Sequence, residues 1–238
     1  MPIQAIEPQR LYRQIAGQLR ALLAKGEYPV GTRLPAERDL ARQLGVSRPT
    51  VREALIALEV EGWVEVRVGS GVYALDRSRR KVASEAPAST EWGPLELLRA
   101  RRVLEGETAA IAAVLAKRKD IVVLGQAIAD MSAAAAAGMI PQDGDREFHS
   151  VIVQVGGNSV LAETVEKFFD GRRGPIATRL GGHFENAKSW SAAIEEHQLI
   201  LDAIRLHDPA AARAAMHQHL DRSHKRFSAS WRRTKHAE

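Results

Sequence analysis

The sequence contains no cysteine among its 238 residues. This absence excludes a disulfide scaffold, a cysteine-ligated zinc or iron–sulfur site, and catalysis by a thiol. Aromatic residues are also scarce, at 5%, whereas 45% of the residues are hydrophobic and alanine is abundant. Alanine, leucine, arginine and glutamate favour helices, whereas strands are enriched in aromatic and β-branched residues. The composition therefore predicts a mainly α-helical protein.

Long apolar segments are missing as well. No stretch reaches the ~18 uninterrupted apolar residues of a membrane span, and the start of the chain holds no apolar run of signal-peptide length. We therefore expect a soluble cytoplasmic protein that has no membrane partner. The net charge of +5 does not identify a nucleic-acid binder by itself, because residues 1–75 hold 10 basic and 8 acidic residues.

The first third of the chain has the pattern of a winged helix-turn-helix. Apolar residues recur at helical spacing over three stretches that glycines terminate. Residues 63–75 then alternate with a period of two around a glycine-rich turn, which predicts a β-hairpin. Three helices followed by a hairpin form a winged helix-turn-helix, whose last helix is the candidate recognition helix. The expected helices span residues 9–25, 35–45 and 47–62.

The remaining sequence predicts a linker and a second, all-helical domain. Residues 1–75 form the expected DNA-binding domain, residues 76–93 the linker, residues 94–230 a domain of six or seven helices, and residues 231–238 a basic tail. The linker has no apolar periodicity, and its basic residues 77–81 suit either a solvated connector or a contact with DNA phosphate.

The candidate recognition helix opens with residues that suit DNA. Arg48 and Arg52 are four residues apart and so share a helix face, and arginine forks match the O6/N7 edge of guanine. The hydroxyls of Ser47 and Thr50 suit phosphate. A plain surface helix with two arginines is the alternative, and the predicted wing and helix-turn-helix spacing argue against it.

Residues 30–41, 44–55 and 58–63 resemble the GntR family of bacterial repressors over the whole first third of the chain. This resemblance implies a transcriptional regulator that binds a short palindromic operator in double-stranded DNA as a homodimer. Pro49 stands where some relatives have threonine, and it cannot donate a backbone hydrogen bond. The DNA contacts that the resemblance implies are Arg38, Ser47, Arg48, Thr50, Arg52 and, at the wing tip, Gly69.

The helical domain holds a candidate metal site. Asp145 and His149 are four residues apart, so one helix face offers both a carboxylate and an imidazole. His197 and His219 lie in later helices and complete a set of three nitrogens and one oxygen, if the helices converge. For any single histidine, a surface position or a hydrogen-bonded core position is the alternative.

The helical domain resembles the FCD effector-binding domain of FadR-type regulators, an all-helical bundle that often holds a divalent metal. The resemblance lies in residues 97–113, 145–149, 157–158, 196–200 and 216–220. The resemblance implies that Asp145, His149, His197 and His219 are the ligands of a divalent ion, with zinc first and nickel, manganese or iron as alternatives. The remaining histidines have no counterpart in the pattern, and we expect them at the surface: His183, His207, His217, His224 and His236.

Two further residues are candidates for binding an effector. Arg101 lies where the subgroup has an arginine, and its guanidinium would clamp a carboxylate; the alternative is an exposed ion pair with Glu105, four residues later. Asn158 would either hydrogen-bond an effector hydroxyl or cap a helix. Arg172, Arg173 and Arg179 are expected to add contacts to an anion.

Residues 11–16, 58–67 and 93–101 resemble the hexuronate-regulon repressors, which respond to glucuronate, galacturonate or ketose isomers such as fructuronate. The expected effector is therefore a small carboxylate, a sugar acid. Another small hydroxy acid is the alternative. A metal-dependent hydrolase fused to a DNA-binding module and a purely architectural DNA binder are the competing classes. No paired carboxylates, nucleophile elbow or phosphate loop supports an enzyme.

Overall fold

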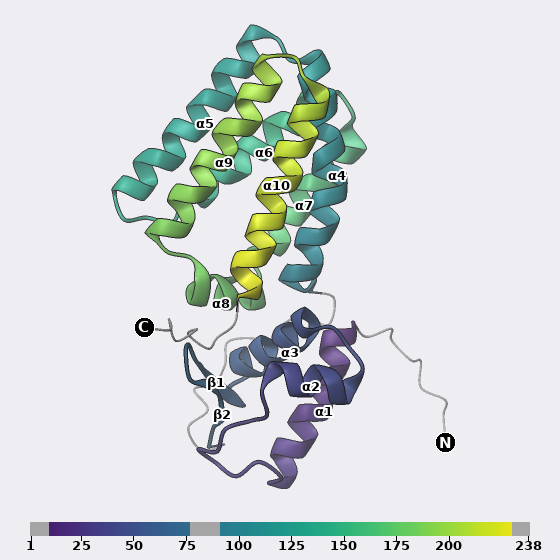
Figure 1. Cartoon of the computed structure of the whole chain (residues 1–238), viewed down its shortest axis with the longest axis vertical. Helices are drawn as coiled ribbons and strands as arrows, with labels where there is room; N and C mark the ends of the chain where they lie inside the picture. The colour runs from purple at the N-terminus through teal and green to yellow at the C-terminus, as the bar shows by residue number, and fades with distance from the viewer. Residues whose placement is uncertain (1–9, 77–90, 230–238) are drawn as a thin grey trace, which may run out of the picture. The chain divides into compact units, whose positions relative to one another are not determined.

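The computed structural model describes residues 10–76 and 91–229, which fall into two compact units (Figure 1). The first unit combines the described residues up to Leu95 with Gly174–His183, and the second contains Glu96–Arg173 and Phe184–Phe227. The expectations for the linker residues 77–81, the tail 231–238 and His236 lie outside the described residues.

Three helices and a hairpin build most of the first unit, and the predicted winged helix-turn-helix is confirmed. The hairpin strands are antiparallel, with Val64 opposite Ala74. Gly26 and Gly45 end the first two helices with φ values of 81° and 66°, in the left-handed region that glycine adopts without a steric penalty. The elements are α1 (Leu11–Lys25), α2 (Glu37–Leu44), α3 (Arg48–Val60), β1 (Val64–Arg67) and β2 (Gly71–Ala74).

Helix α3 is the centre of the first unit. Val51, Leu55 and Leu58 are fully buried, and α3 packs against α1, on which Ile15 and Leu19 are 3% exposed. Burial of this apolar surface stabilises the helix against unfolding. Because every residue from 51 to 59 is buried, only the two ends of α3 remain accessible to a partner.

Seven helices follow among the described residues after position 93, which confirms the mainly α fold (Figure 1). In the second unit α5 packs against both α6 and α9, and α6 packs against α7. The helices are α4 (Pro94–Leu115), α5 (Arg118–Ala136), α6 (Gln142–Val155), α7 (Ser159–Gly171), α8 (Pro175–Phe184), α9 (Ala187–Arg205) and α10 (Pro209–Ser228).

Helix α8 lies inside the predicted helical domain of residues 94–230 but has its contacts in the first unit. Residues 174–183, which include all of α8 except Phe184, group with that unit. The physical reason is a set of polar contacts within that unit. Arg179 and His183 both bond to Glu59 at the end of α3, and the backbone N–H of Ile176 donates to Glu91 at 3.1 Å.

Candidate DNA interface and metal centre

The exposed start of α3 has the chemistry of a phosphate site. The hydroxyl of Ser47 accepts a hydrogen bond from the backbone N–H of Thr50 at 3.4 Å and lies 2.7 Å from the Thr50 hydroxyl. This N-cap confirms the helix start that the sequence predicts. The two hydroxyls stand beside the backbone N–H groups at the positive end of the helix dipole, an arrangement that suits an anion.

Two of the predicted DNA-binding arginines are exposed. The side chain of Arg48 is 50% exposed and that of Arg38, on α2, is 73% exposed. At the wing tip, Gly69 has a φ of 84°, a conformation that favours glycine and lets the turn between β1 and β2 close. The structure therefore leaves these three positions accessible to a duplex.

The structure corrects the prediction that Arg52 contacts DNA. Its side chain is 2% exposed, with Nε 2.6 Å and Nη2 2.7 Å from the two carboxylate oxygens of Glu37 on α2. This buried, bidentate pair joins α2 to α3. The second oxygen of Glu37 also lies 3.7 Å from Nη2 of Arg48. Arg52 thus positions the carboxylate beside Arg48 and is not presented to a base.

Replacing Arg48 with alanine is expected to weaken binding to a duplex from the chain's own promoter region by ~1–3 kcal/mol, the range of a bidentate contact with guanine. Fluorescence anisotropy would measure the dissociation constant. Arg42→Ala is the matched control, because Arg42 is 73% exposed on α2 and was not expected to contact DNA.

The Arg52→Ala variant should behave differently from Arg48→Ala. We expect it to lower the melting temperature, since it leaves the buried Glu37 carboxylate without its main partner. If Arg48→Ala bound the duplex as tightly as the unmodified chain, Arg48 would not be a base-reading residue.

Four buried residues converge in the second unit. Asp145 and His149 come from α6, His197 from α9 and His219 from α10, and one potential ligand atom of each lies within 4.8 Å of all the others. The Nε2 atoms of His149 and His197 are 3.2 Å apart, and Oδ1 of Asp145 is 3.1 Å from Nε2 of His197. The structure thus brings the whole predicted set together.

Hydrogen bonds fix the ring orientation of two histidines of this cluster. Nδ1 of His219 lies 2.9 Å from Glu196, and Nδ1 of His197 lies 2.7 Å from the backbone oxygen of Ala193. When Nδ1 carries the proton of these two bonds, the lone pair of Nε2 is available to a metal. Nδ1 of His149 lies 2.6 Å from Oε2 of Glu105, close to the carboxylate but outside hydrogen-bond geometry.

The charges around the cluster favour neutral imidazoles and ionised carboxylates. Burial, with the neighbouring His197, lowers the pKa of His219 to about 3. Burial raises the pKa of Glu105, but Arg101 and His149 outweigh it and bring the pKa to about 2. Neutral imidazole and anionic carboxylate are the protonation states that bind a divalent cation.

The structure places Arg101 in the ion pair that the sequence offered as an alternative. Its Nε and Nη2 lie 2.5 and 3.1 Å from the two oxygens of Glu105, and both side chains are buried. The guanidinium also lies over the ring of Phe169, 4.5 Å from its centroid. The guanidinium therefore binds Glu105, which in turn contacts His149. This corrects the expectation that Arg101 binds an effector carboxylate.

Asn158 takes the second of its two expected roles, that of a helix cap. Its side chain accepts hydrogen bonds from the backbone N–H groups of Val160 and Leu161 at 3.1 and 3.2 Å, so it caps α7. His183, expected at the surface, is instead mostly buried against Glu59, with its side chain 11% exposed.

Sequence reasoning missed the residues that hold the ligands. Arg172, considered only as an anion contact, binds Oδ2 of Asp145 and leaves Oδ1 facing the histidines. Glu196 bonds to His219, and Arg226 donates to both oxygens of Glu196. The Arg101–Glu105 spacing was a visible signal, whereas the pairings of Arg172 and Glu196 join different helices.

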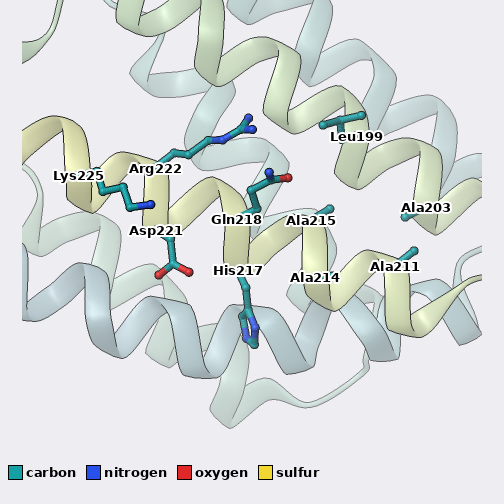
Figure 2. A pocket seen from close by; sticks show the side chains of 10 residues that line it. All are labelled: Leu199, Ala203, Ala211, Ala214, Ala215, His217, Gln218, Asp221, Arg222 and Lys225. Atoms are coloured by element: carbon teal, nitrogen blue, oxygen red, sulfur yellow. The ribbon is translucent and has the colours of Figure 1, made fainter.

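The second unit has a small cavity beside the four-residue cluster and a larger groove elsewhere. A cavity of about 10 Å³, enough for one water molecule, adjoins Arg172 and Phe169. A larger, open groove of about 930 Å³ lies along α9 and α10, floored by alanines and bordered by His217 and Lys225 (Figure 2). None of the four cluster residues lines that groove, so it is separate from the candidate metal centre.

Comparisons with known proteins place both units. Residues 11–74 match the model of the bacterial regulatory proteins of the gntR family, and residues 96–222 match the FCD domain. The chain is 38% identical over 222 residues to the Uxu operon transcriptional regulator of Escherichia coli (strain K12), covering 91% of this chain and 86% of the relative.

Two further relatives have similar coverage. The Exu regulon transcriptional regulator of the same strain is 38% identical, over 92% of this chain and 85% of its own. The putative L-lactate dehydrogenase operon regulatory protein of that strain is 32% identical, over 92% and 88%. No helix within the described residues is long and apolar enough to cross a membrane.

Proposed function

Because the chain belongs to the GntR family of bacterial regulatory proteins and carries an FCD domain, we propose that it is a repressor of sugar-acid catabolism genes. It binds its operator through the winged helix-turn-helix and leaves it when a hexuronate binds the helical unit. The observation that carries this proposal is the similarity to the Uxu and Exu regulators over about nine-tenths of the chain. The relatives are regulators, so the hydrolase alternative is not supported.

The proposed DNA contacts are the predicted residues whose side chains or backbone are accessible to a duplex. A single winged module offers few base contacts, so we propose a homodimer that reads a short palindrome, with one α3 in each half-site. The contacting positions are Arg38, Ser47, Arg48, Thr50 and Gly69, all of which lie at accessible ends of their elements or in turns.

The residues of the buried cluster fit a divalent metal. Three imidazole nitrogens and one carboxylate oxygen are a donor set for zinc, nickel, manganese or iron, and the Nδ1 contacts already orient the rings. We propose that Asp145, His149, His197 and His219 hold the ion. When bound, it supplies a Lewis-acidic centre that attracts a carboxylate and a neighbouring hydroxyl.

A sugar acid suits the surroundings of this cluster. Arg172 lies at the cluster and borders the small cavity together with Arg146 and Arg173. Each of these arginines now pairs with an acidic side chain, whose place a bound carboxylate would take. The cavity holds about one water molecule, so a hexuronate requires these side chains to move. The similarity to the putative L-lactate dehydrogenase operon regulatory protein supports another small hydroxy acid as the second candidate effector class.

A thermal-shift screen of the metal-loaded protein tests the effector class. Glucuronate, galacturonate or fructuronate is expected to raise the melting temperature, because a ligand of the folded state stabilises it. The same acids should release the protein from a duplex of its own promoter region, measured by fluorescence anisotropy. A response to lactate alone would replace the hexuronate proposal with the hydroxy-acid alternative.

A further inference from the structure

Helix α3 carries a buried carboxylate at the end opposite its exposed first turn. Oε1 of Glu59 accepts hydrogen bonds from the backbone N–H of Val66 on β1 at 2.9 Å and from Nη2 of Arg179 at 2.7 Å. Oε2 lies 2.7 Å from Nε2 of His183. One side chain of α3 therefore joins the wing and α8.

The charge on Glu59 is stabilised by these partners. Burial raises its pKa, but the hydrogen bonds from His183 and Arg179 and the N–H of Val66 outweigh burial and lower the pKa below its ordinary value. The carboxylate is thus ionised at neutral pH. Its residue is only 8% exposed, so loss of the α8 partners would leave a buried charge with one backbone donor.

Helix α8 is fixed at its other end as well. The backbone N–H of Ile176 donates to Oε1 of Glu91 at 3.1 Å, and the backbone oxygen of Glu91 accepts from the hydroxyl of Tyr12 on α1 at 2.8 Å. Ile176 and Leu180 are buried. The segment is therefore docked in the DNA-binding unit at both of its ends.

The chain reaches α8 directly from the metal centre. Arg172, at the end of α7, binds Asp145, and the ring of Phe169 lies 5.5 Å from that of His149, centroid to centroid. Only Arg173 separates Arg172 from Gly174, the first residue of the segment 174–183 that groups with the DNA-binding unit. A change at Arg172 therefore acts on Pro175, the first residue of α8, through three peptide bonds.

From these contacts we infer that α8 transmits effector binding to the DNA-binding unit, with Arg179 and His183 as the positioning residues that act on the wing through Glu59. The inference rests on the proposed function. An effector that engages Arg172 shifts the end of α7, and α8 shifts with it. The bonds of Glu59 then change, and with them the position of β1 relative to α3.

The first test measures coupling in the full, metal-loaded chain. We expect glucuronate, galacturonate or fructuronate to raise the dissociation constant of the unmodified chain for its promoter duplex by ~5–150-fold, a typical allosteric range. In an Arg179→Gln/His183→Gln variant, the dissociation constants with and without the acid should be nearly equal, while the acid still raises the melting temperature. Arg205→Gln is the matched control, with a half-exposed arginine on α9 that bonds to Asp202.

Each outcome decides a different claim. A double variant that the acid releases as strongly as the unmodified chain overturns the role of α8. If no acid shifts the melting temperature of the unmodified chain, the proposed function fails instead. Hydrogen exchange without any acid then still tests the inference: the double variant should exchange faster over residues 64–67, and unchanged exchange there would contradict it.

Discussion

The unmodified chain is expected to carry about one divalent ion per protein, as a four-ligand site requires, and the His149→Ala/His197→Ala double variant is expected to lose it. The Nε2 atoms of these two rings are 3.2 Å apart, and removal of both rings leaves one nitrogen and one carboxylate oxygen. Elemental mass spectrometry after gel filtration would measure the metal content of both proteins.

The loss of the ion should also lower stability. A ligand that binds only the folded state stabilises it by ~4 kcal/mol when its free concentration is a thousandfold above the dissociation constant. Added zinc should therefore raise the melting temperature of the unmodified chain but not that of the double variant. His217→Ala is the control, since His217 lies two residues before His219 but lines the groove on α9 and α10 (Figure 2). Full occupancy in the double variant would assign the ion to other residues.

Replacing Glu105 with glutamine is expected to destabilise the helical unit by ~3–5 kcal/mol, the cost of breaking a buried ion pair by removing one partner. Both side chains of the Arg101–Glu105 pair are 2% exposed, so the substitution leaves a buried guanidinium without its carboxylate. It also removes the charge beside Nδ1 of His149. Urea unfolding in the presence of a chelator would measure the change without a contribution from metal.

The same pair predicts a dependence on pH. The pKa of Glu105 is about 2 in the folded chain, below its ordinary value of 4.5, so the folded state binds fewer protons than the unfolded state between these values. Its contribution is complete above about pH 4.5 and is lost as the pH falls toward about 2. The free energy of unfolding should therefore fall more steeply with acid in the unmodified chain than in the variant.

Glu107→Gln is the matched control for this experiment. Glu107 is on the same helix, but its side chain is 58% exposed and its partner Arg213 is 40% exposed. Exposed pairs contribute ~0–1 kcal/mol, so this variant should keep nearly the stability of the unmodified chain. Equal losses in the two variants would show that burial does not set the strength of the Arg101–Glu105 pair.

Local sequence signals determined the secondary structure of the chain and the type of its first unit. The cap at Ser47, the left-handed glycines at positions 26 and 45, and the change of period after residue 62 act over one or two turns of chain. These signals therefore act independently of how the rest of the chain packs. The spacing of Asp145 and His149 likewise places two ligands on one helix face.

Tertiary structure alone decided which polar groups face a partner. Arg48 and Arg52 are equivalent in the sequence pattern, but the packing of α2 on α3 sets Glu37 against Arg52 and leaves Arg48 half exposed. By its sequence position, Arg101 suits an effector carboxylate, whereas in the structure it is buried and pairs with Glu105. The convergence of three helices on the candidate metal centre, and the docking of α8 on Glu59, join residues up to 124 positions apart. Such pairings depend on how the helices pack, and no local pattern encodes them.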